Sequence, residues 1–146
     1  QAALSSELID LLTAARPLLE AQGLALVYDM PNWYDTIQVT RDGTTRPLSQ
    51  WLTDLVDRAV VMDYRDQRPV QLVLVQEELA YARAVGKPLV VASETVCGIA
   101  NEETYCEEGA AALRGSQDGI VQALRGDRGF AGVAIHHFDA LGVLPP

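Results

Sequence analysis

The sequence predicts an α/β protein made of four consecutive βα units, and three observations support this fold class. Four short apolar runs recur roughly every 35 residues, the size of a βα unit. A segment with apolar residues at three- and four-residue spacing, typical of an amphipathic helix, precedes each run. Charged or polar residues follow each run directly. This alternation predicts a parallel sheet covered by helices, with strands at 24–28, 58–62, 88–92 and 130–135.

The segments between these runs predict four helices. The first covers 5–21, with Pro17 expected to kink or end it and Gly23 to stop it. The second runs to Val56, and Ser49 is its expected N-cap. The other two are expected at 69–85, ended by Gly86, and at 102–124, interrupted near its glycines.

The loop after the first strand is long and contains a predicted β-hairpin. Residues 36–45 alternate around Asp42 and Gly43, and an Asp-Gly pair at such a place is a strong hairpin signal. The tail 141–146 is expected to be irregular.

A parallel sheet of four strands is either an open, doubly wound sheet or half of a closed barrel. No glycine-rich phosphate loop follows any of the strands, so the main sign of a nucleotide-binding open sheet is missing. We therefore expect 1–146 to form a single (βα)4 half-barrel domain, with an open flavodoxin-like sheet as the alternative.

The charge balance narrows the choice of partners. The chain has 20 acidic and 11 basic residues, for a net charge of −9, which disfavours nucleic acid and anionic membrane surfaces. No apolar run is long enough for a membrane span and no signal peptide is visible. We expect a soluble protein, and its compartment, cytoplasmic or secreted with a targeting segment missing, stays open.

Cys97 and Cys106 are the only two cysteines in the chain. Two cysteines specify neither a disulfide framework nor a zinc site, which needs about four ligands. Free, partly buried thiols are the favoured reading. A local disulfide is the alternative.

Ionisable residues end all four predicted strands: Asp29, Asp63, Glu94 and His136. Ligands bind at the carboxyl ends of parallel strands, so this repeated placement predicts a polar site there. Cleavage of a glycosidic bond requires two carboxylates across a cleft. The catalytic prediction is therefore Glu94, with Asp29 or Asp63 as its partner.

Other residues near the strand ends suit ligand binding better than catalysis. Trp33, Tyr34 and Tyr64 offer aromatic faces for a sugar ring. His136 and His137 are neighbours on a strand, so their side chains are expected on opposite faces, which disfavours a shared metal ion. We predict no metal and no cofactor. Strand-end acids also cap helices or pair with arginines, and that reading is preferred for Asp66 and Asp139.

Three segments resemble known barrel proteins. Residues 61–66 (VMDYRD), 88–94 (PLVVASE) and 132–138 (GVAIHHF) are similar to the sixth, seventh and eighth strands of uncharacterised bacterial (β/α)8 TIM barrels related to glycoside hydrolases. The resemblance implies the C-terminal half of such a barrel. It also implies a carbohydrate-type cleft into which Met62, Tyr64, Glu94 and His136 face.

The functional hypotheses are thus three: a glycoside-hydrolase-like domain, a non-catalytic barrel that binds carbohydrate or another small molecule, and an open flavodoxin-like interaction module. A half barrel exposes two strand edges and one sheet face, which favours association. We therefore expect a homodimer that pairs through its sheet edges and closes an eight-stranded barrel. Its concave apolar face is expected to contain Val27, Val61, Met62, Val91 and Ile135.

Overall fold

The computed structural model describes residues 2–146 and contains a four-stranded parallel sheet. Its strands are β1 (Val27–Pro31), β4 (Arg58–Met62), β5 (Leu89–Glu94) and β6 (Phe130–His136), and they lie side by side in chain order. The predicted α/β class is confirmed. The order argues against the flavodoxin-like alternative, because there the first strand lies inside the sheet, whereas β1 is at an edge.

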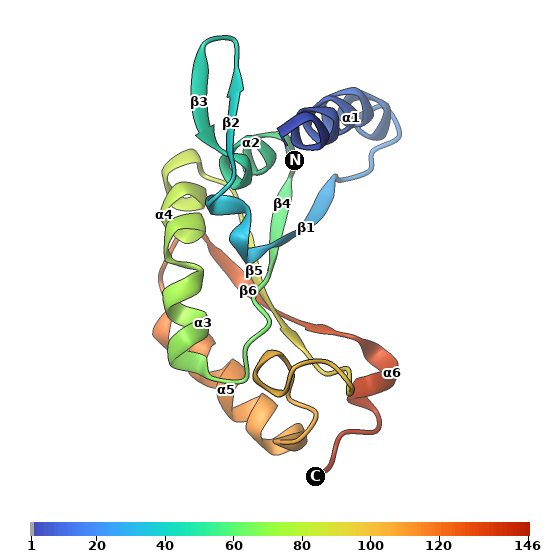
Figure 1. Cartoon of the computed structure of the whole chain (residues 1–146), viewed down its shortest axis with the longest axis vertical. Coiled ribbons are helices and arrows are strands. Elements are labelled where there is room, and N and C mark those ends of the chain that lie inside the picture. The colour runs from blue at the N-terminus through green and yellow to red at the C-terminus, as the bar shows by residue number, and fades with distance from the viewer. Residues whose placement is uncertain (1) are drawn as a thin grey trace.

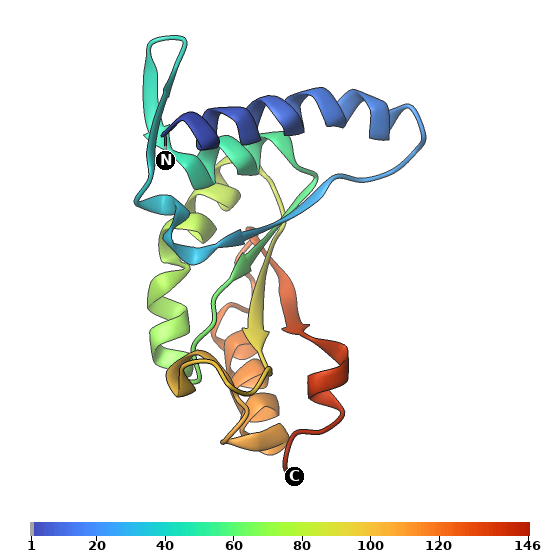
Figure 2. The same ribbon diagram turned by 45° about the vertical axis from the view of Figure 1, so that its right-hand side comes forward.

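Helices cover one side of this sheet. Figure 1 shows α2, α4, α3 and α5 along the left side of the strands, while the side between β1 and α6 is covered by none of these four. Figure 2 shows how strongly the strands twist from β1 to β6. None of the helices within residues 2–146 is long and apolar enough to cross a membrane. The helices are α1 (Ala2–Glu20), α2 (Leu48–Leu55), α3 (Arg68–Leu74), α4 (Gln76–Val85), α5 (Gly109–Ala123) and α6 (Phe138–Leu141).

The main core lies between the sheet and these helices, and it corrects part of the predicted concave face. Successive residues of a strand point to opposite faces, and Val61 and Val91 are fully buried in the helix-covered core. Ile135 is in register with Ser93, two residues on from Val91, and so belongs to that same face. The opposite face carries Val27 and Met62, in the alternate positions of β1 and β4. The predicted set was wrong because it combined both faces of the strands.

That opposite face is also partly apolar. Val90 and Ala92 are buried, yet they are not part of the cluster that packs under the helices. Val27, at the edge, is 47 % exposed. The sheet therefore has a second apolar face that the described helices do not cover.

The first strand lies three residues later than the sequence predicts. Leu26 is outside the strand because its N–H donates to the Asp57 carboxylate (2.7 Å) and its carbonyl accepts from the Asp57 N–H (2.8 Å). As a result, Asp29 is in the middle of β1 and not beyond its end.

Other boundaries differ for local reasons. Pro17 lies within α1 and does not end it, and Ser49 lies buried inside α2, where Pro47 takes the N-cap position. The helix predicted over 69–85 divides at Val75 into α3 and α4. The helix predicted from residue 102 starts only at Gly109, whose φ of +83° does not fit a helix interior. Within the tail predicted to be irregular, Leu141 closes the short helix α6.

The hairpin prediction is confirmed. Strands β2 (Gln38–Arg41) and β3 (Thr44–Pro47) pair antiparallel. Asp42 and Gly43 both have positive φ, at 50° and 77°. Two such residues define a type I′ turn, which explains the Asp-Gly sequence.

One glycine permits the close packing of β6 against α4. A Cβ on Gly129 would lie 2.8 Å from the carbonyl oxygen of Leu79 and 2.9 Å from the backbone nitrogen of Arg83. We expect Gly129→Ala to lower the free energy of unfolding by about 1–3 kcal/mol, because helix backbone cannot move aside cheaply. Gly115→Ala is the control, since a Cβ there meets nothing within 4 Å. Urea unfolding of both variants would contradict the prediction if they were equally stable.

Candidate functional site

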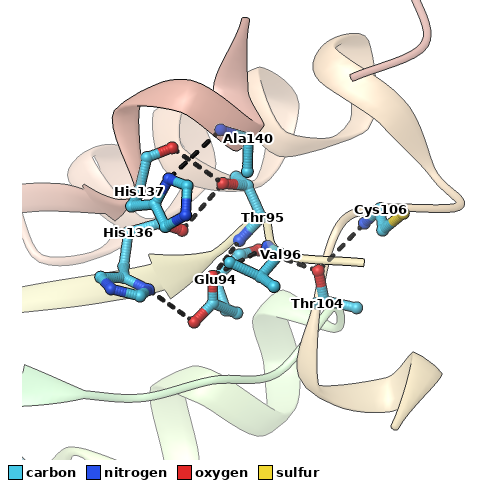
Figure 3. Close-up of polar contacts among 8 residues, drawn as sticks. All are labelled: Glu94, Thr95, Val96, Thr104, Cys106, His136, His137 and Ala140. Atoms are coloured by element: carbon cyan, nitrogen blue, oxygen red, sulfur yellow. Dashed lines mark hydrogen bonds and ion pairs between the residues drawn. The ribbon is translucent and has the colours of Figure 1, made fainter. Parts of the chain in front are cut away.

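The ends of β5 and β6 bring together Glu94 and His136, which are in register. Oε2 of Glu94 is 2.7 Å from Nδ1 of His136. Its Oε1 accepts hydrogen bonds from the backbone N–H groups of Thr95 (2.7 Å) and Val96 (2.9 Å) (Figure 3). Glu94 is only 4 % exposed. Both oxygens of this carboxylate are therefore engaged, and its direct effect is to orient the imidazole.

The imidazole of His136 is the accessible member of this pair. Its side chain is 53 % exposed. Nδ1 faces the carboxylate, and none of the hydrogen bonds found within residues 2–146 uses Nε2. With the proton on Nδ1, Nε2 is left as an acceptor for a ligand or a proton.

Tyr64 lies beside His136 and links it to the rest of the site. The two rings are stacked, with centroids 6.0 Å apart. Burial raises the pKa of Tyr64 to about 12, and the charges of Glu94 and Asp29 add to this rise. The phenol therefore keeps its proton at neutral pH. The strand register puts Asp29 and Glu94 on the same face of the sheet.

A shallow cavity of about 230 Å³ adjoins Tyr64. Trp33 is 57 % exposed at this cavity, so an aromatic face is open to solvent. Arg65 donates to the Tyr64 carbonyl (2.7 Å) and pairs with Glu103 (3.3 Å). The cavity is smaller than the roughly 300–1,000 Å³ of most drug-sized sites, which suits one ring of a ligand. Its lining is Asn32, Trp33, Met62, Tyr64, Arg65 and Glu103.

The structure does not place Asp29 next to Glu94. Asp29 is level with Val60 and Val90, four positions before Glu94 along the strands, or roughly 13 Å of strand length. The two carboxyl groups of glycosidases lie about 5–9.5 Å apart. The backbone positions of Asp29 and Glu94 are therefore farther apart than such a pair requires.

Asp63 is not part of this surface either. It is 0 % exposed, and neither carboxylate oxygen has a hydrogen-bond partner within residues 2–146. Burial raises the pKa of Asp63 to about 7, although the nearby Asn32 side chain and the positive charge of Arg65 both lower this pKa. It follows Met62 in the chain and so lies on the helix-covered face, away from Glu94.

A second buried acid, Glu78, did not appear among the sequence candidates. It is buried on α4, and burial raises its pKa to about 7, with the charges of Asp35, Glu77 and Asp63 adding to the effect. Its spacing from Val75 and Ala82, three and four residues, marks it as part of the buried helix face. That spacing was the signal available in the sequence.

Tyr34 is separate from the Trp33 cavity. It packs partly buried against the core and lines a different, largely apolar cavity beside α1. The structure therefore brings Trp33, Met62, Tyr64 and His136 together at one end of the sheet and leaves Tyr34 outside this group.

Two expectations about neighbouring residues were wrong. Cys97 and Cys106 form a disulfide, with Cα atoms 5.2 Å apart, and are not free thiols. The loop folds back because the Tyr105 N–H donates to the Glu94 carbonyl (3.0 Å). The side chains of His136 and His137 were expected on opposite faces of one strand, but β6 ends at His136 and the two rings lie edge to face, with centroids 5.2 Å apart.

No three His, Cys, Asp or Glu side chains within residues 2–146 converge on a position suited to a metal ion. Comparisons of the chain with protein-family models, with curated proteins and with solved structures find no match. The functional argument therefore depends on the site itself.

Proposed function

We propose that this chain is one half of a (β/α)8 barrel whose mouth binds carbohydrate. One observation supports this above the others. An exposed tryptophan, a tyrosine and an oriented histidine share one surface at the carboxyl end of a parallel sheet. That end is where barrels bind their ligands. The sequential strand order and the helices on one side of the sheet support the half-barrel geometry.

The chemistry of the surface favours a neutral, hydroxyl-rich ligand. Trp33 provides an apolar face, while Asn32, Arg65 and Glu103 provide hydrogen-bond donors and acceptors around it. A few polar groups around an apolar wall is the usual composition of a small-molecule site. The net charge of −9 disfavours anionic ligands.

Binding without turnover is the function that the geometry supports best. Glu94 holds His136 and two backbone amides, so its carboxylate is not free to attack or protonate a glycosidic bond. Glycoside hydrolysis is the second candidate. By strand register Asp29 and Glu94 lie on the same face of the sheet, four positions apart along the strands.

The binding proposal is tested at Trp33. We expect Trp33→Ala to weaken binding of a neutral oligosaccharide by about tenfold or more, the cost of losing a stacked aromatic contact. Trp33→Phe should retain most of the affinity because a ring remains. Val73→Ala, an exposed site on α3, is the control. Calorimetry against neutral glycans in which Trp33→Ala binds as tightly as the unmodified chain would contradict the proposal.

The two sheet edges support a further part of the proposal, that a second copy completes the barrel. β1 and β6 have no strand on their outer sides within residues 2–146. Each edge strand has an exposed apolar side chain, Val27 on β1 and Ile135 on β6, and three exposed leucines on α1 recur at seven-residue spacing. A two-fold pair would place β6 of one copy beside β1 of the other. These exposed side chains are Leu4, Leu11 and Leu18 on α1, Val27 on β1, Val121 on α5, Ile135 on β6, and Phe138 and Val143 after β6.

This assembly predicts a mass in solution of twice 15.8 kDa. Size-exclusion chromatography with light scattering measures this mass. We expect the dimer interface to bury more than about 2,000 Å², as in obligate dimers. Leu11→Glu should shift the dimer toward monomer. A monodisperse monomer at micromolar concentration would contradict the dimer while leaving the binding test at Trp33 unaffected.

A further inference from the structure

The loop that follows β5 is closed by a disulfide directly beyond the contacts that hold Glu94. The N–H groups of Thr95 and Val96 donate to the Glu94 carboxylate (Figure 3). Cys97 is the next residue in the chain. The carboxylate in turn contacts Nδ1 of His136 at 2.7 Å. Cys97 is thus connected to the imidazole of His136 through two successive hydrogen bonds, from the Val96 N–H to Glu94 and from Glu94 to Nδ1 of His136.

The other end of the disulfide is anchored in the protein interior. Cys106 follows Tyr105, which is 1 % exposed and whose hydroxyl contacts Ser116 at 2.6 Å. The Tyr105 N–H donates to the Glu94 carbonyl (3.0 Å). The N–H of Cys106 donates to the Thr104 hydroxyl (3.2 Å). The disulfide therefore joins a fixed segment to the segment whose amides hold Glu94.

We propose that the Cys97–Cys106 disulfide is a redox-sensitive positioning element for the Glu94–His136 pair. The inference rests on the proposed site. Cys97 is exposed, so a dithiol reductant can reach its sulfur. The dithiol supplies two electrons and two protons and becomes a disulfide, while the Cys97–Cys106 bond breaks to give two thiols.

Reduction acts mainly on one hydrogen bond. Thr95 is also held by β6, because its N–H and hydroxyl both donate to the His136 carbonyl (2.7 and 2.8 Å). No second hydrogen bond holds Val96 within residues 2–146, so its N–H is the donor that the disulfide keeps in place. Without this donor the carboxylate can rotate away from the imidazole.

The two histidines of the chain provide a direct readout. A carboxylate only accepts, so Nδ1 of neutral His136 carries the proton. Nδ1 of His137 accepts from the Ala140 N–H at 3.2 Å, so its proton is on Nε2. The two rings should therefore be opposite tautomers. Nitrogen NMR of the imidazoles distinguishes them, and His137 is the internal reference.

The experiment compares the oxidised chain with the same chain in dithiothreitol and with Cys97→Ser/Cys106→Ser, at about pH 8, above the usual histidine pKa. We expect the ratio of Nδ1–H to Nε2–H tautomer of His136 to fall about fivefold, as for the loss of one ordinary hydrogen bond. His137 should not change. An unchanged His136 ratio in a folded, reduced chain would overturn the proposal.

A second variant covers the case in which reduction unfolds the chain and the His137 signal is lost as well. Two glycines inserted after Gly98 keep the disulfide but lengthen the ring that it closes. We expect the His136 ratio to fall in the same direction, and an unchanged ratio would overturn the proposal. No ligand is used, so this outcome is independent of the binding test at Trp33.

Discussion

Asp63→Asn is expected to stabilise the folded chain more at pH 8 than at pH 4, by up to about 4 kcal/mol in the free energy of unfolding. This figure follows because each tenfold difference in proton affinity between the folded and the unfolded chain is worth about 1.4 kcal/mol. Asp63 is fully buried, its oxygens have no hydrogen-bond partner within residues 2–146, and its pKa is raised from 3.8 to about 7. Folding above that pH requires a buried, unpaired charge. The amide removes the charge and keeps the shape.

The direction of the pH effect follows from proton binding. Below about pH 4, the Asp63 carboxyl is protonated in the folded and the unfolded chain, and its stabilising effect is fully present. Between about pH 4 and pH 7 the unfolded chain releases the proton first, so stability falls as pH rises. Above the folded pKa of about 7 the loss is complete. The free energy of unfolding, measured with urea at each pH, should fall less steeply with rising pH for Asp63→Asn than for the unmodified chain.

Glu78 contributes to the same slope. Its pKa is also raised to about 7, and the charge of Asp63 is one of the causes. Because the two groups interact, the double variant Asp63→Asn/Glu78→Gln should change the free energy of unfolding by less than the sum of the two single changes. The prediction would be contradicted if the free energy of unfolding of the unmodified chain did not change between pH 4 and pH 7, or if it changed equally with pH in the unmodified chain and all variants.

The strands and the hairpin were predictable because their signals are local. β4 occupies the predicted residues, Arg58–Met62, since an unbroken apolar run ends there in polar residues. The Asp42-Gly43 turn followed from the positive φ that only certain residues adopt easily. The start of β1 was not predictable in this way, because Leu26 is held by Asp57, thirty-one residues further along the chain.

The candidate site was predictable in part. Glu94 and His136 end neighbouring strands, and the parallel register brings them together as expected. The sequence does not show which hydrogen bonds the two carboxylate oxygens of Glu94 accept. The amides of Thr95 and Val96 make Glu94 a positioning residue for His136, which only the turn geometry reveals. The disulfide depended likewise on the folding back of Tyr105.

Asp63 shows a different limit. A strand-end acid can point to either face of a sheet, and a shift of one residue reverses the answer. The sequence places Asp63 after Met62, but the face is decided by which side the helices cover. Asp63 lies on the covered side, among Gln71 and Ser93, where a carboxylate affects stability more than ligand binding.

The side chain of Tyr105 is expected to be among the most important for stability. It is 1 % exposed, and its hydroxyl contacts Ser116 (2.6 Å) and Gln71 (3.1 Å). The amide of Gln71 donates to the Asp63 carbonyl (3.0 Å). This polar network connects the loop after β5 to α3, α5 and the end of β4. Removal of the ring therefore loosens several elements together.

We expect Tyr105→Ala to lower the free energy of unfolding by about 3–5 kcal/mol, the usual cost of truncating a buried aromatic side chain. Tyr105→Phe is the matched variant, because it keeps the ring and removes only the hydroxyl. Its cost should be about 1–2 kcal/mol, since Ser116 still donates to Gln71 (3.2 Å) after the hydroxyl is lost. Urea unfolding of both variants measures the difference. Equal costs would mean that the hydrogen bonds, and not the packing of the ring, hold the loop in place.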